Sequence, residues 1–452
     1  MLDRRDIEEI EFAADATPEA MAKRLAGLHP ADIAAALGNV DGETLKSVLG
    51  RLDTDVAADV LINLDEHSLS EVLGALEPPE IADIATELPS DDAADVVGIL
   101  DEGRRAAVLS RLGAEDRREV ENLLKYEDES AGGIMASEVV YVNERAAVDE
   151  AIRLIREAAD EIDEIHNVYV TDRKRRLKGV LSMRTLVLAR SGTCVEDILD
   201  RDVISVSTDM DQEEVANLFR KYDLVSLPVV EPDGTLIGRI TVDDIIDVIH
   251  DEADEDISIM AGTREEELHE ESALRVSRIR LPWLIVGALG GLGSASVMNL
   301  YSLSLEKVLP LAFFVPVITA MGGNVGLQTS TIIVRGMHGS GGLADETISR
   351  LLREWRVAVT NAAILGGGVF LAVWLWLDDW PVALAGVVGG ALATVVLVAA
   401  TLGTVMPLLL RRLGFDPAVA QGPFVTTLND VIGIIVYLGL ASLFLERLLP
   451  LS

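Results

Sequence analysis

Cysteine and positive charge are both scarce in this chain of 452 residues. Cys194 is the only cysteine, which excludes an internal disulfide and a thiol metal cluster. The 38 basic residues are outnumbered by 75 acidic ones, giving a formal net charge of −37. Because so negative a surface repels phosphates, it argues against nucleic acid and anionic lipid as partners and favours divalent cations. An excess of acid is also typical of adaptation to a saline cytoplasm.

The sequence also lacks the motifs of covalent chemistry. It contains no Walker motif, and its six histidines are scattered along the chain. We therefore expect a protein that is not an enzyme. The polar start, MLDRRDIEEI, predicts that no signal peptide is present.

The acidic excess ends near Arg280, where long apolar stretches begin. Beyond Arg280 the chain has nine acids and eight bases, a net charge of −1, so the first 280 residues carry −36. Five stretches are apolar enough and long enough to cross a bilayer as helices, and their many glycines would allow close helix packing. They are predicted at Leu281–Leu303, Leu305–Met337, Val357–Leu377, Pro381–Leu410 and Ala418–Leu449.

Basic residues divide unevenly between the loops that join these stretches. With a cytoplasmic N-terminus, the cytoplasmic side carries Arg278, Arg280, Arg335, Arg350, Arg353, Arg356, Arg411 and Arg412. Only Lys307 and Arg447 lie on the other side. The positive-inside rule therefore predicts a multi-pass protein of the inner or plasma membrane, with cytoplasmic N-terminal domains and the C-terminus outside.

Asp430 lies inside the last of these stretches, where an ionised side chain is costly. A charge near the bilayer centre costs about 3 kcal/mol and normally faces a water-filled or protein-lined interior. Asp430 is therefore predicted to hold a cation on a permeation path. The alternative is a carboxylate that lies nearer a helix end or bonds a neighbouring helix. Because five spans are too few for an inverted repeat, we expect a pore at the axis of a homodimer.

The first 125 residues contain an apolar repeat of 12 residues. Its members are Leu28, Val40, Leu52, Leu64, Leu76, Leu88, Leu100, Leu112 and Leu124. Many have an apolar residue three positions earlier, as Leu25 precedes Leu28. Units such as LHPADIAAAL predict short helices that end at Pro or Asp, with Asp capping the next helix. Stacked as a superhelix, they would bury a continuous leucine seam and form a scaffold.

Residues 134–249 contain a second repeat, with an offset of 59 residues. VYVTDRKRRLKGVLSMRTL aligns with LPVVEPDGTLIGRITVDDI, so that Gly179 falls on Gly238. Each copy has the pattern helix, strand, turn, strand, helix. This arrangement resembles a pair of CBS domains, which form ligand-sensing pseudo-dimers.

CBS domains that hold adenine nucleotides usually carry the motif G-x-x-[ST]-x-x-D, whose Asp contacts the ribose. The second copy has it as Gly238, Thr241 and Asp244, whereas the first has Thr185 in place of the Asp. The resemblance therefore implies at most one site for ATP or another adenine nucleotide, at Thr241 and Asp244. The alternative is a folded module that binds no nucleotide.

A strongly acidic stretch, IIDVIHDEADEDISIMAG, joins this repeat to the first span. The usual interpretation of such a run is a solvated helix. Between a sensor and a pore, however, so many like charges would repel unless a cation bridged them. Mg²⁺ and Ca²⁺ are hard cations that prefer carboxylate oxygens. We expect a bound divalent cation to close this cluster and its loss to let the cluster open.

The chain as a whole resembles the MgtE family of magnesium transporters. The resemblance rests on PVITAMGGNVGLQTSTIIVRG (316–336), on TTLNDVIGIIVYL (426–438), and on the order of the parts. It implies a multidomain membrane protein with an all-α superhelical N domain (1–130), an α/β tandem CBS pair (131–246), a connecting plug helix (247–276) and a five-helix transmembrane domain (277–452). It also implies a homodimeric, Mg²⁺-selective channel for magnesium uptake, which cytosolic Mg²⁺ bound among the soluble domains and the plug holds shut.

The same resemblance assigns roles to single residues. Asp430 corresponds to the pore carboxylate, and Gly322, Gly323 and Asn324 belong to the pore motif of the second span. The acids that bind regulatory Mg²⁺ correspond to Asp91, Asp95, Asp211, Glu213, Asp223, Asp244, Asp247, Glu252, Glu255 and Asp256. One departure is Leu327, where relatives often have Asn. A polar pore contact is therefore either absent or supplied by Asn429.

Other functions fit parts of this pattern. The same architecture could pass Co²⁺ or Mn²⁺, which sites rich in oxygen do not exclude. Chloride channels and osmolyte pumps also carry CBS pairs, but Asp430 and the near absence of basic residues within the spans disfavour them. A membrane-anchored nucleotide sensor would leave Asp430 and the glycine-rich second span unexplained. A measurement of ion flux separates the transporters from the sensor.

Overall fold

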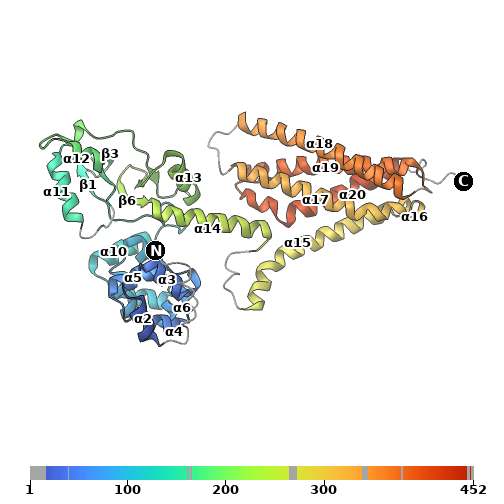
Figure 1. The fold of residues 1–452 in the computed structure, drawn as a ribbon. Helices are drawn as coiled ribbons and strands as arrows, with labels where there is room; N and C mark the ends of the chain where they lie inside the picture. Colours follow the sequence, from blue (N-terminus) through green and yellow to red (C-terminus); the bar gives the residue numbers. More distant parts are fainter. Residues whose placement is uncertain are drawn as a thin grey trace. The chain divides into compact units, whose positions relative to one another are not determined.

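The chain divides into two units, Met1–Ile249 and His250–Ser452 (Figure 1). The computed structural model describes residues 17–452, except 39, 160, 161, 163, 164, 264–271, 338–344, 378, 379, 445–447 and 449–452. The predicted end of the last span at Leu449 and the predicted location of the C-terminus lie outside the described residues.

The first unit begins with a stack of short helices, as the 12-residue repeat predicts (Figure 1). They are α2 (Pro18–Leu25), α3 (Pro30–Leu37), α4 (Gly42–Leu49), α5 (Thr54–Ile62), α6 (Glu66–Ala75), α7 (Pro78–Ala85), α8 (Ser90–Ile99), α9 (Glu102–Leu109) and α10 (Ala114–Leu123). Aspartates at the helix starts accept backbone N–H groups that have no partner inside the helix. Asp41 accepts from Thr44, Asp65 from Ser68, and Asp101 from Gly103 and Arg104.

The leucine seam of these helices is formed by the repeat's marker residues and by the row three positions before them; the marker residues Leu64, Leu76, Leu88, Leu100 and Leu112 are buried in it. Leu25, Leu37 and Leu49 close their helices and are almost completely buried. Leu28 and Leu52 follow in the connecting turns and are only partly buried. At the start of the stack the turn residue therefore lies at the edge of the core.

Two copies of a small three-stranded unit follow. The first contains β1 (Tyr141–Asn143), α11 (Val148–Ala158), β2 (Asn167–Thr171), β3 (Leu177–Ser182) and α12 (Met183–Leu188). The second contains β4 (Val206–Ser207), α13 (Gln212–Tyr222), β5 (Ser226–Val230), β6 (Leu236–Thr241) and α14 (Val242–Ala261). The sequence pattern did not predict β1 and β4, because strands of three and two residues are too short to show an alternating pattern.

The two copies have the same topology and register. In each, the first strand runs parallel to the second, and the second pairs antiparallel with the third. Val170 pairs with Gly179, and Val229 pairs with Gly238, which confirms the offset of 59 residues. The copies contact each other through a 2.6 Å hydrogen bond between the Tyr169 and Ser226 hydroxyls.

The helix that closes the second copy continues through the acidic stretch. α14 begins at Val242 and runs to Ala261 without a break. Val206, Leu227 and Ile240 of the second copy share one apolar core with the helical stack. The start of α14 is thereby fixed against the stack within the first unit.

The described residues of the second unit form five helices that are long and apolar enough to cross a membrane, as predicted. They are α15 (Ala273–Leu300), α17 (Pro310–Met337), α18 (Asp345–Trp376), α19 (Val382–Arg412) and α20 (Pro423–Leu443), with a short helix α16 (Ser302–Lys307) between the first two. α15 and α18 begin earlier than predicted. Backbone hydrogen bonds extend a helix through polar residues such as Arg278, which a hydropathy window excludes.

Helix α19 packs against α17, α18 and α20. Glycines make the closest approaches possible: Gly389 of α19 meets Gly366 of α18, and Gly403 of α19 meets Gly326 of α17. By contrast, α15 has no buried residue and packs on α20 through Gly290 and Thr427.

Candidate cation sites

Asp430 lies within a membrane-length helix, about two turns from its start at Pro423. Its side chain is half-buried. The neighbouring Asn429 is only 2% exposed and lies against α17. A half-buried carboxylate inside an apolar helix is the arrangement that marks ion pathways in membrane proteins.

Gly326 of α17 makes room for Asn429, because a Cβ at this position would overlap Nδ2 of Asn429. Gly322 is farther away: a Cβ there would lie 3.8 Å from the Asn429 backbone oxygen, an ordinary contact. Nδ2 is buried and has no hydrogen-bond partner among the described residues. The structure therefore brings Gly322 and Asn429 near each other, where α20 meets α17.

Of the predicted residues of α17, Asn324 lies on a different face. Asn324 and Gln328, four positions apart, are exposed on the single chain, whereas Gly322 and Gly323 are buried. Leu327 is partly buried. The described part of this one chain therefore does not bring Asn324 together with Asn429.

A second group of carboxylates lies in the first unit. Asp91 and Asp92 are in the first turn of α8, and Asp95 is one turn later. Asp244 of α14 faces all three closely enough to raise the pKa of Asp91, Asp92 and Asp95. Asp247 acts on Asp92 in the same way. Predicted ligands from two distant segments are thus brought together.

Loss of water around these carboxylates is the main cause of their raised pKa values, and mutual repulsion is the second. The pKa of Asp92 rises to about 7. That of Asp95 rises to about 6, although Asp95 as a whole residue is exposed, so its shift is the weaker support for a dry cluster. The pKa of Asp91 is raised well above its usual range. Carboxylates that resist ionisation in each other's presence are stabilised by a positive ion between them.

The Asp91 carboxylate fits such an ion. Its Oδ1 is buried and accepts no hydrogen bond from any described residue. The surrounding donors are carboxylate oxygens, the ligands that Mg²⁺ and Ca²⁺ prefer. Within the described ranges no three acidic, histidine or cysteine side chains form a ready-made metal site. Mg²⁺ keeps several of its waters, so one or two carboxylates are enough to hold it.

The predicted list omitted contributors to this cluster. Asp92 shares a helical turn with Asp91, a signal that was present in the sequence. Asp128 raises the pKa of Asp95, and Glu138 raises that of Asp91. Glu138 also accepts hydrogen bonds from the N and Oγ of Ser90, at 3.0 and 2.8 Å. Asp128 and Glu138 come close to the acids of α8 only because the helical stack packs on the second copy.

Other predicted ligands lie apart from one another. Asp211 caps the start of α13 and accepts from the Glu213 N–H, whereas Asp223 ends the helix with a φ of 51°. An 11-residue helix separates its ends by about 16 Å. The three remaining predicted acids belong to the second unit, and α14 carries them on adjoining turns: Glu252, Glu255 and Asp256.

The predicted nucleotide residues contact each other directly. Oδ2 of Asp244 accepts hydrogen bonds from the N and Oγ1 of Thr241, at 3.0 and 2.8 Å. This pair forms the start of α14, in the manner of a capping box. The same carboxylate faces the acids of α8. Its assignment to a ribose or to a cation stays a prediction.

The acidic cluster predicts a pH dependence of local stability. The pKa values of Asp92 and Asp95 lie above the ordinary 3.8, so the folded state retains protons that the unfolded state has released. Their stabilising contribution is full below about pH 4 and is lost as the pH rises through about 6 to 7. In Mg²⁺-free buffer we expect hydrogen exchange of α8, corrected for its intrinsic rate, to accelerate over that window. Asp92→Asn should reduce this pH dependence of the exchange rate, and Asp83→Asn should leave it unchanged. An unchanged pH dependence in Asp92→Asn would contradict the argument.

Family models match most of the chain. The model for a divalent cation transporter, MgtE, matches residues 315–440, and that for the MgtE intracellular N domain matches 28–129. CBS domain models match 131–192 and 195–251.

Individual proteins are similar over a comparable length. The magnesium transporter MgtE of Thermus thermophilus is 41% identical over 339 residues, which are 72% of this chain and 72% of that protein. The MgtE of Enterococcus faecalis is 38% identical over 331 residues, with the same coverage of 72% on both sides. A solved cytosolic domain of the Mg²⁺ channel MgtE in complex with ATP is 39% identical, with 52% of this chain and 99% of that one covered and a TM-score of 0.49.

Proposed function

The chain belongs to the MgtE family of magnesium transporters, and from this membership we propose that it conducts Mg²⁺ across the membrane past Asp430. The single observation that supports this path most directly is a half-buried carboxylate inside a membrane-length helix. Mg²⁺ dehydrates reluctantly and is usually held through its waters by one or two carboxylates. Two copies of Asp430 across the axis of a homodimer would hold a hydrated ion in this way.

Closure of the path depends, in this proposal, on Mg²⁺ bound to the cytoplasmic acids. The raised pKa values of Asp92 and Asp95 support it, because repulsion among α8 and α14 carboxylates opposes their approach in the absence of a cation. A bound ion removes that repulsion. At low cytosolic Mg²⁺ the ion leaves, the carboxylates repel, and the channel opens. The channel is thereby regulated by the ion that it conducts.

The function is tested by Mg²⁺ flux into proteoliposomes that contain a Mg²⁺-sensitive dye. With little Mg²⁺ on the side of the soluble domains, we expect uptake well above that of protein-free liposomes. Repeating the measurement with Co²⁺ or Mn²⁺ outside identifies the preferred ion. Folded protein that passes none of these ions would contradict the proposal and favour the membrane-anchored nucleotide sensor.

Neutralising the acids of the linking helix should leave the channel open. We expect the triple variant Glu252→Gln, Glu255→Gln, Asp256→Asn to conduct at millimolar internal Mg²⁺, at which the native protein is closed, because the removed charges no longer draw a bridging ion. The measurement uses dye-loaded liposomes with Mg²⁺ on both sides and a radioactive tracer outside, and the uptake of the tracer reports conduction. Asp254→Asn, on the same helix, is the matched control. Normal closure of the triple variant would refute the bridging account.

A further inference from the structure

A cavity of about 540 Å³ lies in the first CBS copy. Tyr141 of β1, Leu154 of α11 and the turn between β2 and β3 contribute to its walls. Its volume is in the range of sites for small organic molecules, about 300–1,000 Å³. Thr171, the last residue of β2, also lines it.

This cavity is separate from the position of the nucleotide motif. In the first copy that motif ends with Ser182 and Thr185, at the start of α12. Ser182 pairs with Asn167, the first residue of β2, whereas the cavity lies at Thr171, the last. The two positions are at opposite ends of the same strand.

Arg175 reaches this cavity from an unfavourable backbone conformation. It has a φ of 61°, which a residue with a Cβ adopts at a cost. Its equivalent in the second copy, 59 residues later, is Gly234, with a φ of 84°. The turn therefore needs a left-handed residue in both copies, and only the first copy has a side chain there.

The Arg175 side chain is arranged as an anion receptor. Its guanidinium carbon lies 4.7 Å from the centre of the Tyr141 ring. Its Nε is buried and has no hydrogen-bond partner in the described part of the chain. The stacked ring holds the guanidinium in place without using its N–H groups.

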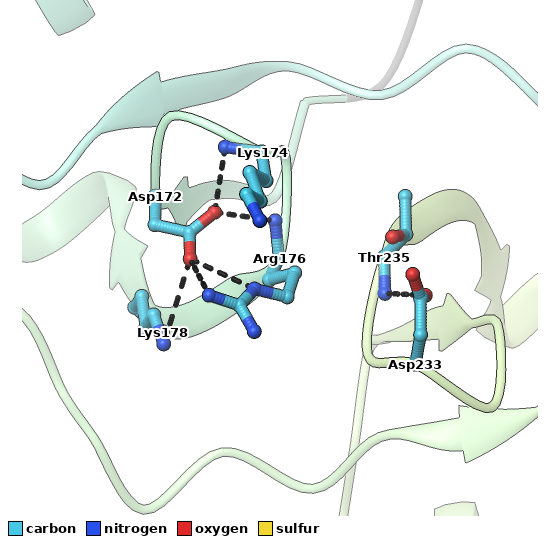
Figure 2. A network of polar contacts seen from close by, with 6 residues as sticks. All are labelled: Asp172, Lys174, Arg176, Lys178, Asp233 and Thr235. Carbon is cyan, nitrogen blue, oxygen red and sulfur yellow. Dashed lines mark hydrogen bonds and ion pairs between the residues drawn. The ribbon is translucent and has the colours of Figure 1, made fainter.

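The charge of the surrounding turn favours an anion in an otherwise acidic protein. Asp172, an acid of the cavity wall, is held by Arg176 at 2.9 Å and by Lys178 at 3.8 Å; Figure 2 shows both side chains directed at its carboxylate. Its charge is thus already compensated. Arg173 and Arg175 line the cavity, and the other acid in its wall, Glu150, is exposed to solvent, which screens its charge.

We propose that this cavity binds a phosphate monoester of a small aromatic group. Arg175 and Arg173 bind the phosphate, since guanidinium groups match phosphate oxygens in pairs. The ring packs on the apolar wall formed by Val140, Leu154 and Ala158. The site is particular to the first copy, because the second copy has Gly234 in place of Arg175. A ligand there would act on the sensor independently of the proposed cation sites.

The test uses the full chain in detergent, without Mg²⁺, and phenyl phosphate as the probe. Titration calorimetry should show saturable binding to the native protein. Arg175→Gly should weaken it by about tenfold or more, because it removes the charge-assisted hydrogen bonds to the phosphate. This variant also introduces the residue that the turn prefers, so its melting temperature should not fall. Arg153→Ala is the matched control, since Arg153 lies on α11 but pairs with Glu157.

Two results would overturn the proposal. One is equal binding of phenyl phosphate by the native protein and by Arg175→Gly, which would place the probe elsewhere or in the micelle. The other is an absence of saturable binding at millimolar concentrations of the probe. Loss of binding in Arg175→Gly together with full binding in Arg153→Ala would support the site.

Discussion

Replacing Asp430 by asparagine is expected to reduce Mg²⁺ uptake by at least about a hundredfold while leaving the protein folded. Two unit charges about 4 Å apart attract by about 4 kcal/mol at an intermediate dielectric, and a divalent ion by more. Because each 1.4 kcal/mol is about a tenfold change, loss of this attraction greatly reduces ion occupancy. Asparagine has nearly the same shape, so the packing of α20 should persist. Dye-loaded proteoliposomes measure the initial rate.

A second carboxylate of the same unit provides the control for this substitution. Glu306 lies on the short helix α16 and is exposed. Glu306→Gln removes the same charge by the same chemical change and should leave uptake close to native. Thermal unfolding in detergent checks that both variants are folded. Equal uptake by Asp430→Asn and the native protein would move the ion path away from α20.

Long patterns in the sequence were sufficient to predict much of the fold. The 12-residue spacing of leucines predicted the helical stack, and the alignment of Gly179 with Gly238 predicted the shared register of the two copies. Five apolar stretches predicted the five long helices. Each of these signals is repeated over many residues, so single exceptions do not hide it. The short strands β1 and β4 gave no such signal, since their pairing is decided by tertiary contacts.

The candidate sites depend more on contacts between distant residues. Asp430 could be found from the sequence, because a carboxylate in an apolar stretch is conspicuous. The approach of Asp244 to Asp91, Asp92 and Asp95 requires the packing of α14 on α8, which no local pattern encodes. Likewise, the fit of Asn429 into the space above Gly326 depends on how α17 and α20 meet.

Gly403→Ala is expected to disturb the ion path through the contact of α19 with α17. A Cβ on Gly403 would lie 2.5 Å from the Gly326 carbonyl oxygen and 3.1 Å from the Thr329 Cβ. Backbone atoms cannot rotate away, so α19 and α17 must separate. Overpacking of this kind costs about 1–3 kcal/mol. Because the displaced segment of α17 supports Asn429, we expect Mg²⁺ uptake to fall about tenfold or more, together with a lower unfolding temperature.

Gly390→Ala, on the same helix, is the matched control for this prediction. A Cβ on Gly390 meets no atom of the chain within 4 Å, so the same added methyl group should leave both uptake and unfolding temperature near native. If Gly403→Ala were as active and as stable as Gly390→Ala, the close contact of α19 with α17 would not position the residues beside Asp430.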